Sequence, residues 1–175
     1  MACLCCCLLS CQDDDEVSPA ISEVSVLRNG EPWQNLVIYS SFRENCDTEE
    51  LGFSVVHRNK DDVIRERLSI SGLSTVSEER YSVVPTNLTN DDSCNDLPHV
   101  ALNFLQDDGD VGAGGAPLIT SVDNWVEITN YDVAKQEIRG KFQLTFYDTL
   151  YQDTIQFVNG EFYTSVLPDT RGEPE

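Results

Sequence analysis

The sequence predicts an all-β fold, with an antiparallel β-sandwich as the expected architecture and an open β-barrel as the alternative. Past residue 20, apolar and polar residues alternate with a period of two, as they do in half-buried antiparallel strands. Clusters of turn-forming residues separate these short runs, and no long amphipathic helix interrupts them. Nine or ten short strands with regular turns are typical of a sandwich.

The alternation is clearest between Ile138 and Tyr147. One face of this segment is apolar and the other polar: Ile138, Phe142, Leu144 and Phe146 against Arg139, Lys141, Gln143 and Thr145. The segment Trp125–Tyr131 alternates in the same way, with Val126 and Ile128 on its apolar face. Further strands are expected at Ile21–Arg28, Leu36–Phe42, Leu51–Arg58, Arg67–Gly72, Arg80–Val84, Val100–Leu105, Ile155–Val158 and Glu161–Val166.

Turn signals lie between these strands. Asn29-Gly30 and Asn159-Gly160 each predict a hairpin, because both residue types tolerate a positive φ. Polar clusters at 59–62 and 90–92 predict further turns, and Asp61–Leu68 is expected to form one short helix capped by Asp61. The glycine-rich segment 112–115 lacks the Lys-Ser/Thr of a phosphate loop, so it is expected to be a mobile loop.

The N-terminus has the pattern of an export signal. Five of the seven cysteines fall within the first eleven residues, in a spacing that does not suit structural zinc. Leu8-Leu9-Ser10-Cys11 resembles a bacterial lipobox, although no Lys or Arg precedes the apolar segment. The resemblance implies that the Cys11 thiol receives a diacylglycerol and that cleavage falls before it.

The residues after Cys11 are acidic. The run comprises Gln12, Asp13, Asp14, Asp15 and Glu16. It resembles the signal that sends lipoproteins of Bacteroidota to the outer face of the outer membrane; a periplasm-facing anchor and a solvated spacer are the alternatives. The expected organisation is a signal peptide over 1–10, a flexible tether over 11–20, one sandwich domain over 21–168 and a disordered tail over 169–175.

The charge of the chain restricts its partners. Eleven Lys and Arg against 31 Asp and Glu give a net charge of -20 and a pI of about 4.1. Nucleic-acid binding requires a basic face, so this class is not expected. Adhesion to anionic lipid through protein charge is not expected either, which leaves a lipid anchor as the contact with the membrane.

Two groups of residues outside the N-terminus are candidate sites. Asp107, Asp108 and Asp110 offer carboxylate oxygens on a bent backbone to Ca²⁺, although the segment does not match the EF-hand pattern and a solvated acidic loop is the alternative. Asp91, Asp92 and Asp96 would join this site if the loops meet. No other cofactor is expected.

Cys46 and Cys94 are the two thiols that remain once the signal is removed and Cys11 is acylated. Both lie in polar sequence, and an exported protein keeps its disulfides. The sequence therefore predicts a bridge between them, with two free thiols as the alternative.

No motif of a hydrolase nucleophile, a phosphate loop or a zinc protease occurs in the chain. His57 and His99 are expected to be structural or exposed, because no Cys or Ser nucleophile lies near them in the sequence. A set of aromatic residues offers a carbohydrate-stacking surface, although core positions are the more frequent use of such residues: Trp33, Tyr39, Trp125, Tyr131, Tyr147, Tyr151 and Tyr163.

Three segments carry a family resemblance. Val126–Asp132, Ile138–Phe142 and Asn159–Phe162 follow the pattern "V-x-I-T-x-Y-D … I-x-G-x-F … N-G-x-F", which resembles uncharacterised Bacteroidota lipoproteins of the DUF6252 type over about residues 125–166. The resemblance implies a fold and a location, but no activity. We expect a non-enzymatic surface lipoprotein that binds a glycan or protein or serves the envelope structurally. The alternatives are a calcium-dependent adhesion or glycan-binding module and a small carboxylate-based hydrolase.

Overall fold

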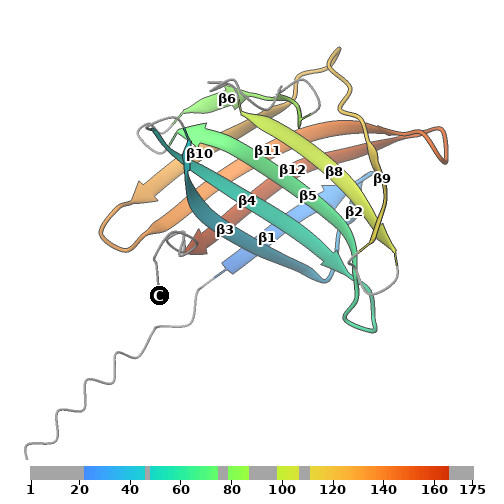
Figure 1. Cartoon of the computed structure of the whole chain (residues 1–175), viewed down its shortest axis with the longest axis horizontal. Helices are drawn as coiled ribbons and strands as arrows, with labels where there is room; N and C mark the ends of the chain where they lie inside the picture. The colour runs from blue at the N-terminus through green and yellow to red at the C-terminus, as the bar shows by residue number, and fades with distance from the viewer. Residues whose placement is uncertain (1–21, 46–47, 75–78, 87–97, 107–110, 166–175) are drawn as a thin grey trace, which may run out of the picture.

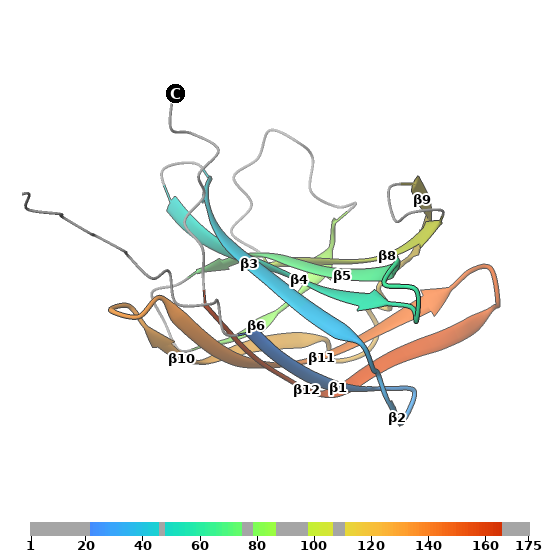
Figure 2. The ribbon, with the colours of Figure 1, turned by 90° about the horizontal axis from the view of Figure 1, so that it is seen from below.

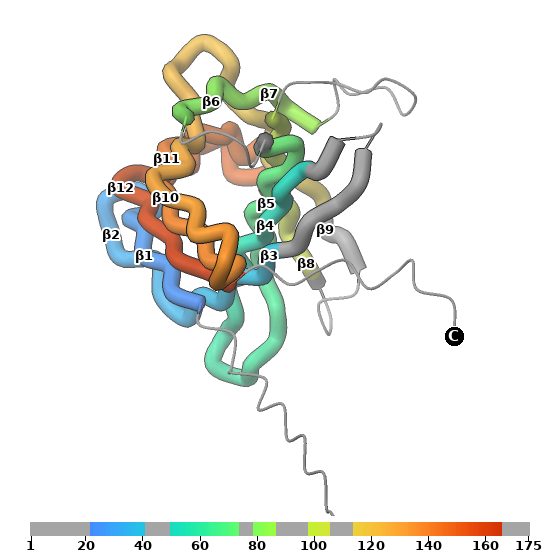
Figure 3. The backbone as a smooth tube through the Cα atoms, turned by 90° about the vertical axis from the view of Figure 1, so that its left-hand side faces the viewer, coloured from blue at the N-terminus to red at the C-terminus, as the bar shows by residue number. Residues whose placement is uncertain are grey.

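The chain folds into two stacked β-sheets, and the predicted sandwich is confirmed (Figures 1 and 2). The computed structural model describes residues 22–45, 48–74, 79–86, 98–106 and 111–165. Neither sheet closes on itself, so the open barrel is not the architecture. Viewed from the side, the sheets form two separate layers (Figure 3).

Sheet A consists, in spatial order, of β2 (Glu31–Pro32), β1 (Ser22–Arg28), β12 (Asp153–Ser165), β11 (Glu137–Asp148), β10 (Trp125–Asp132) and β6 (Arg80–Ser82). Sheet B consists of β3 (Leu36–Asn45), β4 (Thr48–Arg58), β5 (Ile64–Ser74), β8 (His99–Gln106) and β7 (Val84–Pro85), and β9 (Val111–Ala116) also pairs with β8. Neighbouring strands are antiparallel except for the short parallel pair of β7 and β8.

The period-two prediction for β10 and β11 is confirmed. Val126 and Ile128 of β10 are buried, as are the apolar residues of β11, and together they form the sheet-A side of the core. Aromatic rings join the two layers: Phe53 of β4 lies 4.4 Å from Phe162 of β12, centroid to centroid. Both sheets bury mostly alternate residues, with exceptions at Val55–Val56 and Leu144–Phe146, and the exposed residues of β11 and β12 point away from the partner sheet.

Two glycines on adjacent strands make room for two phenylalanine rings. Gly140 of β11 lies directly opposite Phe162 of β12, and Phe142 lies directly opposite Gly160. A Cβ atom at Gly140 would lie 2.4 Å from the Phe162 ring, and one at Gly160 would lie 2.7 Å from the Phe142 ring. Each ring therefore occupies the space that a side chain opposite it would need. The Ile138–Phe142 and Asn159–Phe162 segments are thus a packing motif of the sandwich core.

The hairpin predicted at Asn159-Gly160 is wrong. β12 continues through both residues, and the two predicted strands 155–158 and 161–166 belong to one strand. Asn159 adopts a φ of 54°, and the registers of β12 with both β11 and β1 shift at this point, as they do in a β-bulge. The bulge thus needs a positive φ at Asn159 alone, and Gly160 instead makes room for the Phe142 ring.

The hairpin predicted at Asn29-Gly30 is confirmed. Arg28 pairs with Glu31, so two residues connect β1 to β2, with φ values of 53° and 85°. These values suit a type I′ turn. The Asn29 side chain also accepts a hydrogen bond of 2.7 Å from the Gln156 backbone N–H, which ties the turn to β12.

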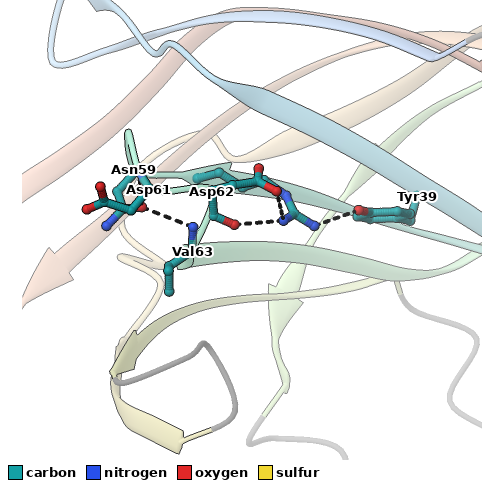
Figure 4. A network of polar contacts seen from close by, with 6 residues as sticks. Tyr39, Asn59, Asp61, Asp62 and Val63 are labelled. Atoms are coloured by element: carbon teal, nitrogen blue, oxygen red, sulfur yellow. Dashed lines mark hydrogen bonds and ion pairs between the residues drawn. The ribbon is translucent and has the colours of Figure 1, made fainter.

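The short helix predicted at Asp61–Leu68 is wrong, because β5 begins at Ile64. Asn59, rather than Asp61, organises this turn: its side-chain oxygen accepts the backbone N–H groups of Asp61 at 2.9 Å and Val63 at 3.0 Å (Figure 4). Asp62 then adopts a φ of 64°, which a helix does not allow. The result is the β4–β5 hairpin.

The glycine-rich segment 112–115, expected to be a mobile loop, lies within strand β9. A Cβ atom at Gly115 would lie 2.9 Å from the Leu102 carbonyl oxygen of β8, so this close pairing of strands needs a residue without a side chain. The strand predicted at Arg80–Val84 is divided between the layers. β6 joins sheet A, and β7 joins sheet B after the buried Val83.

Candidate functional site

A shallow groove of about 480 Å³ crosses the outer face of sheet A, on the side opposite the core. The alternation of β11 and β12 directs the side chains into it: Arg139 and Lys141 flank Gly140, and Glu161 and Tyr163 flank the buried Phe162. β1 contributes Glu23 and Ser25, and β10 contributes Thr129.

A second depression of about 390 Å³ continues the groove toward β10. Both depressions share Ser25, Lys141 and Glu161, so they form one surface. We call it the sheet-A groove. The second depression adds Trp125, Gln143, Asn159 and Gly160. The bulge at Asn159 thus contributes a polar side chain to the groove.

Tyr163 and Arg139 form one end of the groove. They lie directly opposite each other on β12 and β11, and the Arg139 guanidinium carbon lies 4.5 Å from the centre of the Tyr163 ring. The Tyr163 hydroxyl donates a hydrogen bond to the Glu137 carboxylate, which raises the pKa of Tyr163 above its ordinary value. Arg139 also forms a side-chain hydrogen bond with Tyr163 and lowers this pKa, but the effects of Glu137 and of burial outweigh it.

Trp125 forms the other end. It lies opposite Gln143 of β11, and on its other side the edge strand β6 brings the Arg80 guanidinium 4.0 Å from the indole ring. Arg80 also forms an ion pair of 3.0 Å with Asp123. Arg139 and Gln143 are four residues apart on β11, so the two aromatic ends are roughly 13 Å apart along the strand and about 10 Å across it.

Lys141 and Glu161 occupy the middle of the groove. They lie opposite each other on β11 and β12 and form an ion pair of 3.1 Å between exposed side chains. A pair this exposed adds little stability. Both groups can therefore exchange water or each other for polar groups of a ligand.

A second charged cluster lies between the sheets. Arg28 of β1 and Glu66 of β5 form an ion pair of 3.0 Å that joins sheet A to sheet B, with side-chain exposures of 31% and 16%. His57 of β4 lies opposite Glu66 of β5. Its ring contacts that of Trp33, with 5.8 Å between the ring centroids. Three buried polar atoms here have no hydrogen-bond partner within the described part of the chain: Arg28 Nε, Glu66 Oε2 and His57 Nδ1.

The sequence reasoning missed this cluster, although an alternation signal existed. Arg28 shares the parity of the buried Val26, and Glu66 shares the parity of the buried Leu68 and Ile70. Both charged residues therefore face the core. His57 also faces this region, and the structural or exposed role expected for it stays a prediction.

The predicted aromatic surface is divided by the structure. Trp33 and Tyr131 pack against the core, and Tyr39, Tyr147 and Tyr151 are exposed away from the sheet-A groove. Trp125 and Tyr163 line the groove. Alternation places both of them on the outer face of their strands, but it does not show that two arginines stack on them.

The predicted lipidation, export, calcium and disulfide residues lie outside the described residues: Cys11, 12–16, Asp107, Asp108, Asp110, Cys46 and Cys94. In the sequence, the acidic segment 91–96 precedes β8 and the acidic segment 107–110 follows it. The two ends of this eight-residue strand are roughly 23 Å apart. The described residues alone contain no group of three or more His, Cys, Asp or Glu that could hold a metal ion.

The chain matches no family model, and neither a curated protein nor a solved structure matches it. The resemblance to DUF6252 lipoproteins therefore stays a prediction. Within the described ranges, no helix has the length and apolar character needed to span a membrane.

Proposed function

We propose that the protein is a lipid-anchored, non-enzymatic binding module of the cell envelope, and that the sheet-A groove holds an extended glycan. The observation that carries the proposal is a groove over a hydrogen-bonded sheet with an aromatic residue at each end. Binding sites combine aromatic surface with a few polar groups that fix the orientation of the ligand. Sugar rings present both an apolar face and hydroxyl groups, so they suit such a lining.

The middle of the groove supports the same ligand class. Ser25, Gln143 and Asn159 offer neutral donors and acceptors, and the Lys141–Glu161 pair offers charged ones. The strands fix these groups before a ligand arrives, which lowers the entropic cost of binding. The described lining contains two carboxylates, Glu23 and Glu161, and Glu161 is paired with Lys141, so we expect binding without calcium.

The lipobox at 8–11 and the acidic run at 12–16 support an outer-membrane location that faces the cell exterior. β1 begins at Ser22, so residues 12–21 would connect the anchor to sheet A next to Glu23 of the groove. Labelling with an azido fatty acid should tag the wild type and leave Cys11→Ala untagged; label on that variant would contradict the anchor. Replacing 13–16 with Ala should reduce protease accessibility on intact cells, and unchanged accessibility would leave the run a spacer.

A glycan array tests the binding function. The intact lipoprotein, held in detergent micelles, should bind a set of extended glycans equally well with calcium and with a chelator. Trp125→Ala and Tyr163→Ala should each weaken binding at least ten-fold. Tyr151→Ala is the matched control, because this aromatic residue is 78% exposed and lies outside the groove.

Two results would contradict the proposal. Binding that survives both groove substitutions would place the ligand elsewhere on the molecule. Binding that is lost with the chelator would favour the calcium-dependent alternative. Gln143→Ala, which removes only a neutral polar group from the groove, provides a milder variant if Trp125→Ala fails to fold.

A further inference from the structure

We infer that the Arg139 end of the sheet-A groove is a subsite for the carboxylate of an acidic sugar within an otherwise neutral glycan. The inference rests on the proposed function and names the chemistry of one unit of its ligand.

Arg139 differs from the other cations around the groove. Lys141 is paired with Glu161, and Arg80 is paired with Asp123. Arg139 is exposed and forms no ion pair with any residue that the structure describes. Its positive charge is therefore available to a ligand in the groove.

Two carboxylates near Arg139, those of Glu137 and Glu23, do not form an ion pair with it. Glu137 accepts the hydrogen bond of the Tyr163 hydroxyl. Glu23 lines the groove from β1, but Tyr163 on β12 lies between it and Arg139, since the two are paired with opposite sides of Tyr163. Neither carboxylate forms an ion pair with Arg139, so the guanidinium can still pair with a ligand carboxylate.

The stacking of Arg139 on Tyr163 favours a carboxylate in particular. A guanidinium that lies over an aromatic ring keeps a fixed plane, and its paired N–H groups match the two oxygens of a carboxylate. The contact also reduces the side-chain entropy that binding would cost.

The charge of the whole chain argues for a single acidic unit. A net charge of -20 repels densely charged polyanions such as heavily sulfated polysaccharides. Of the described cations that line the groove, Arg139 is the one without an ion pair, and it matches one carboxylate. The sugars that follow the acidic unit along the groove would then be neutral and would contact the Lys141–Glu161 pair and Trp125.

The test compares neutral oligosaccharides with counterparts that carry one uronic acid, the methyl esters of these acids and singly sulfated analogues. The wild-type lipoprotein should bind the acid at least ten-fold more tightly than the ester. Arg139→Gln should abolish that preference, so that the acid and its ester bind equally, and Arg139→Lys should retain only part of it. Arg67→Gln, on the outer face of sheet B, should change neither affinity.

Three outcomes of this test would overturn the inference or a part of it. Equal binding of acid and ester by the wild type overturns the inference and leaves the proposed function standing. Equal binding of the sulfated analogue overturns the assignment to a carboxylate. An absence of binding to every oligosaccharide overturns both the inference and the proposed function.

Discussion

Gly140 and Gly160 are the residues whose replacement the fold should tolerate least. A methyl group at either position would overlap a phenylalanine ring on the opposite strand. Overpacking of this kind typically costs about 1–3 kcal/mol. We predict that Gly140→Ala and Gly160→Ala each lower the free energy of unfolding by about that amount, measured by denaturant titration.

Gly52 provides the matched control for these substitutions. It also lies within a strand, but a Cβ atom there would meet its nearest neighbour at 3.5 Å, an ordinary contact. Gly52→Ala should therefore leave stability nearly unchanged. Combining Gly160→Ala with Phe142→Leu should recover part of the loss, because the smaller side chain vacates the space. A Gly160→Ala variant as stable as the wild type would contradict the packing motif.

The stability of the fold depends on pH through the carboxylate of Asp132. Its carboxylate accepts the Lys135 backbone N–H at 3.2 Å and pairs with the Lys135 ammonium at 3.4 Å, which lowers the pKa of Asp132 below its ordinary value of 3.8. A lowered pKa stabilises the fold above the ordinary value, and this contribution is lost as the pH falls through the folded pKa.

We therefore predict that Asp132→Asn is less stable than the wild type at pH 7 and that the difference disappears as the pH falls through the lowered pKa of Asp132, because the wild-type carboxyl then becomes neutral as well. Denaturant titrations of both proteins across this range measure the difference. A difference that does not change with pH would show that the charge of Asp132 contributes nothing.

Among the structural elements, the facing ends of β1 and β5 are held by the Arg28–Glu66 pair. Removing one partner of a buried ion pair typically costs about 3–5 kcal/mol, because it leaves the other charge without a partner. Because the Arg28 and Glu66 side chains are 31% and 16% exposed, water reduces this cost. We expect Glu66→Ala to lower the free energy of unfolding by about 1–3 kcal/mol, measured by thermal or denaturant unfolding.

Replacing both residues with Leu should cost less than Glu66→Ala alone, since no uncompensated charge remains. This double variant is the control for the loss of packing. If it proves at least as unstable as Glu66→Ala, the contribution of the cluster comes from its shape rather than from its charges.

The strands were predictable from sequence wherever one face is apolar, as in β11, because alternation and burial have the same period. The connections were less predictable. Asn159-Gly160 has the residues of a hairpin but forms a bulge, since both neighbouring runs pair with β11. β9 is rich in glycine and shows no alternation, and its pairing with β8 follows from close backbone contact.

The candidate site was predictable only in part, for a similar reason. Alternation places Arg139, Lys141, Trp125 and Tyr163 on the polar faces of their strands. Their meeting in one groove depends on which strands are neighbours, and β1 becomes the neighbour of β12 across almost the whole chain. Nothing local in the sequence encodes that order.

At the scale of the whole molecule, the predicted disulfide would tie two distant segments of sheet B. Glu50 pairs with Ser74 and Ser71 pairs with His99, so the strand ends next to both cysteine-bearing segments border the same end of the sheet. Cys46 and Cys94 themselves lie outside the described residues, so the bridge between them stays a prediction. A bridge between Cys46 and Cys94, which are 48 residues apart in the sequence, would raise the free energy of unfolding by about 4 kcal/mol on the chain-entropy model.

Mass spectrometry of the non-reduced protein after alkylation checks the bridge. The expected result is one linked peptide pair that contains Cys46 and Cys94, with neither thiol alkylated. Full alkylation of both cysteines before reduction would contradict it. Cys94→Ser should then match the stability of the reduced wild type.

The central claim, that the sheet-A groove is the binding face, is tested most directly by an NMR titration of the intact lipoprotein in micelles with the glycan it binds most tightly. We expect the largest amide shifts on outward-facing residues of β11 and β12, such as Arg139, Lys141, Glu161 and Tyr163. Shifts concentrated on sheet B or on residues 107–110, with the sheet-A groove unchanged, would contradict it.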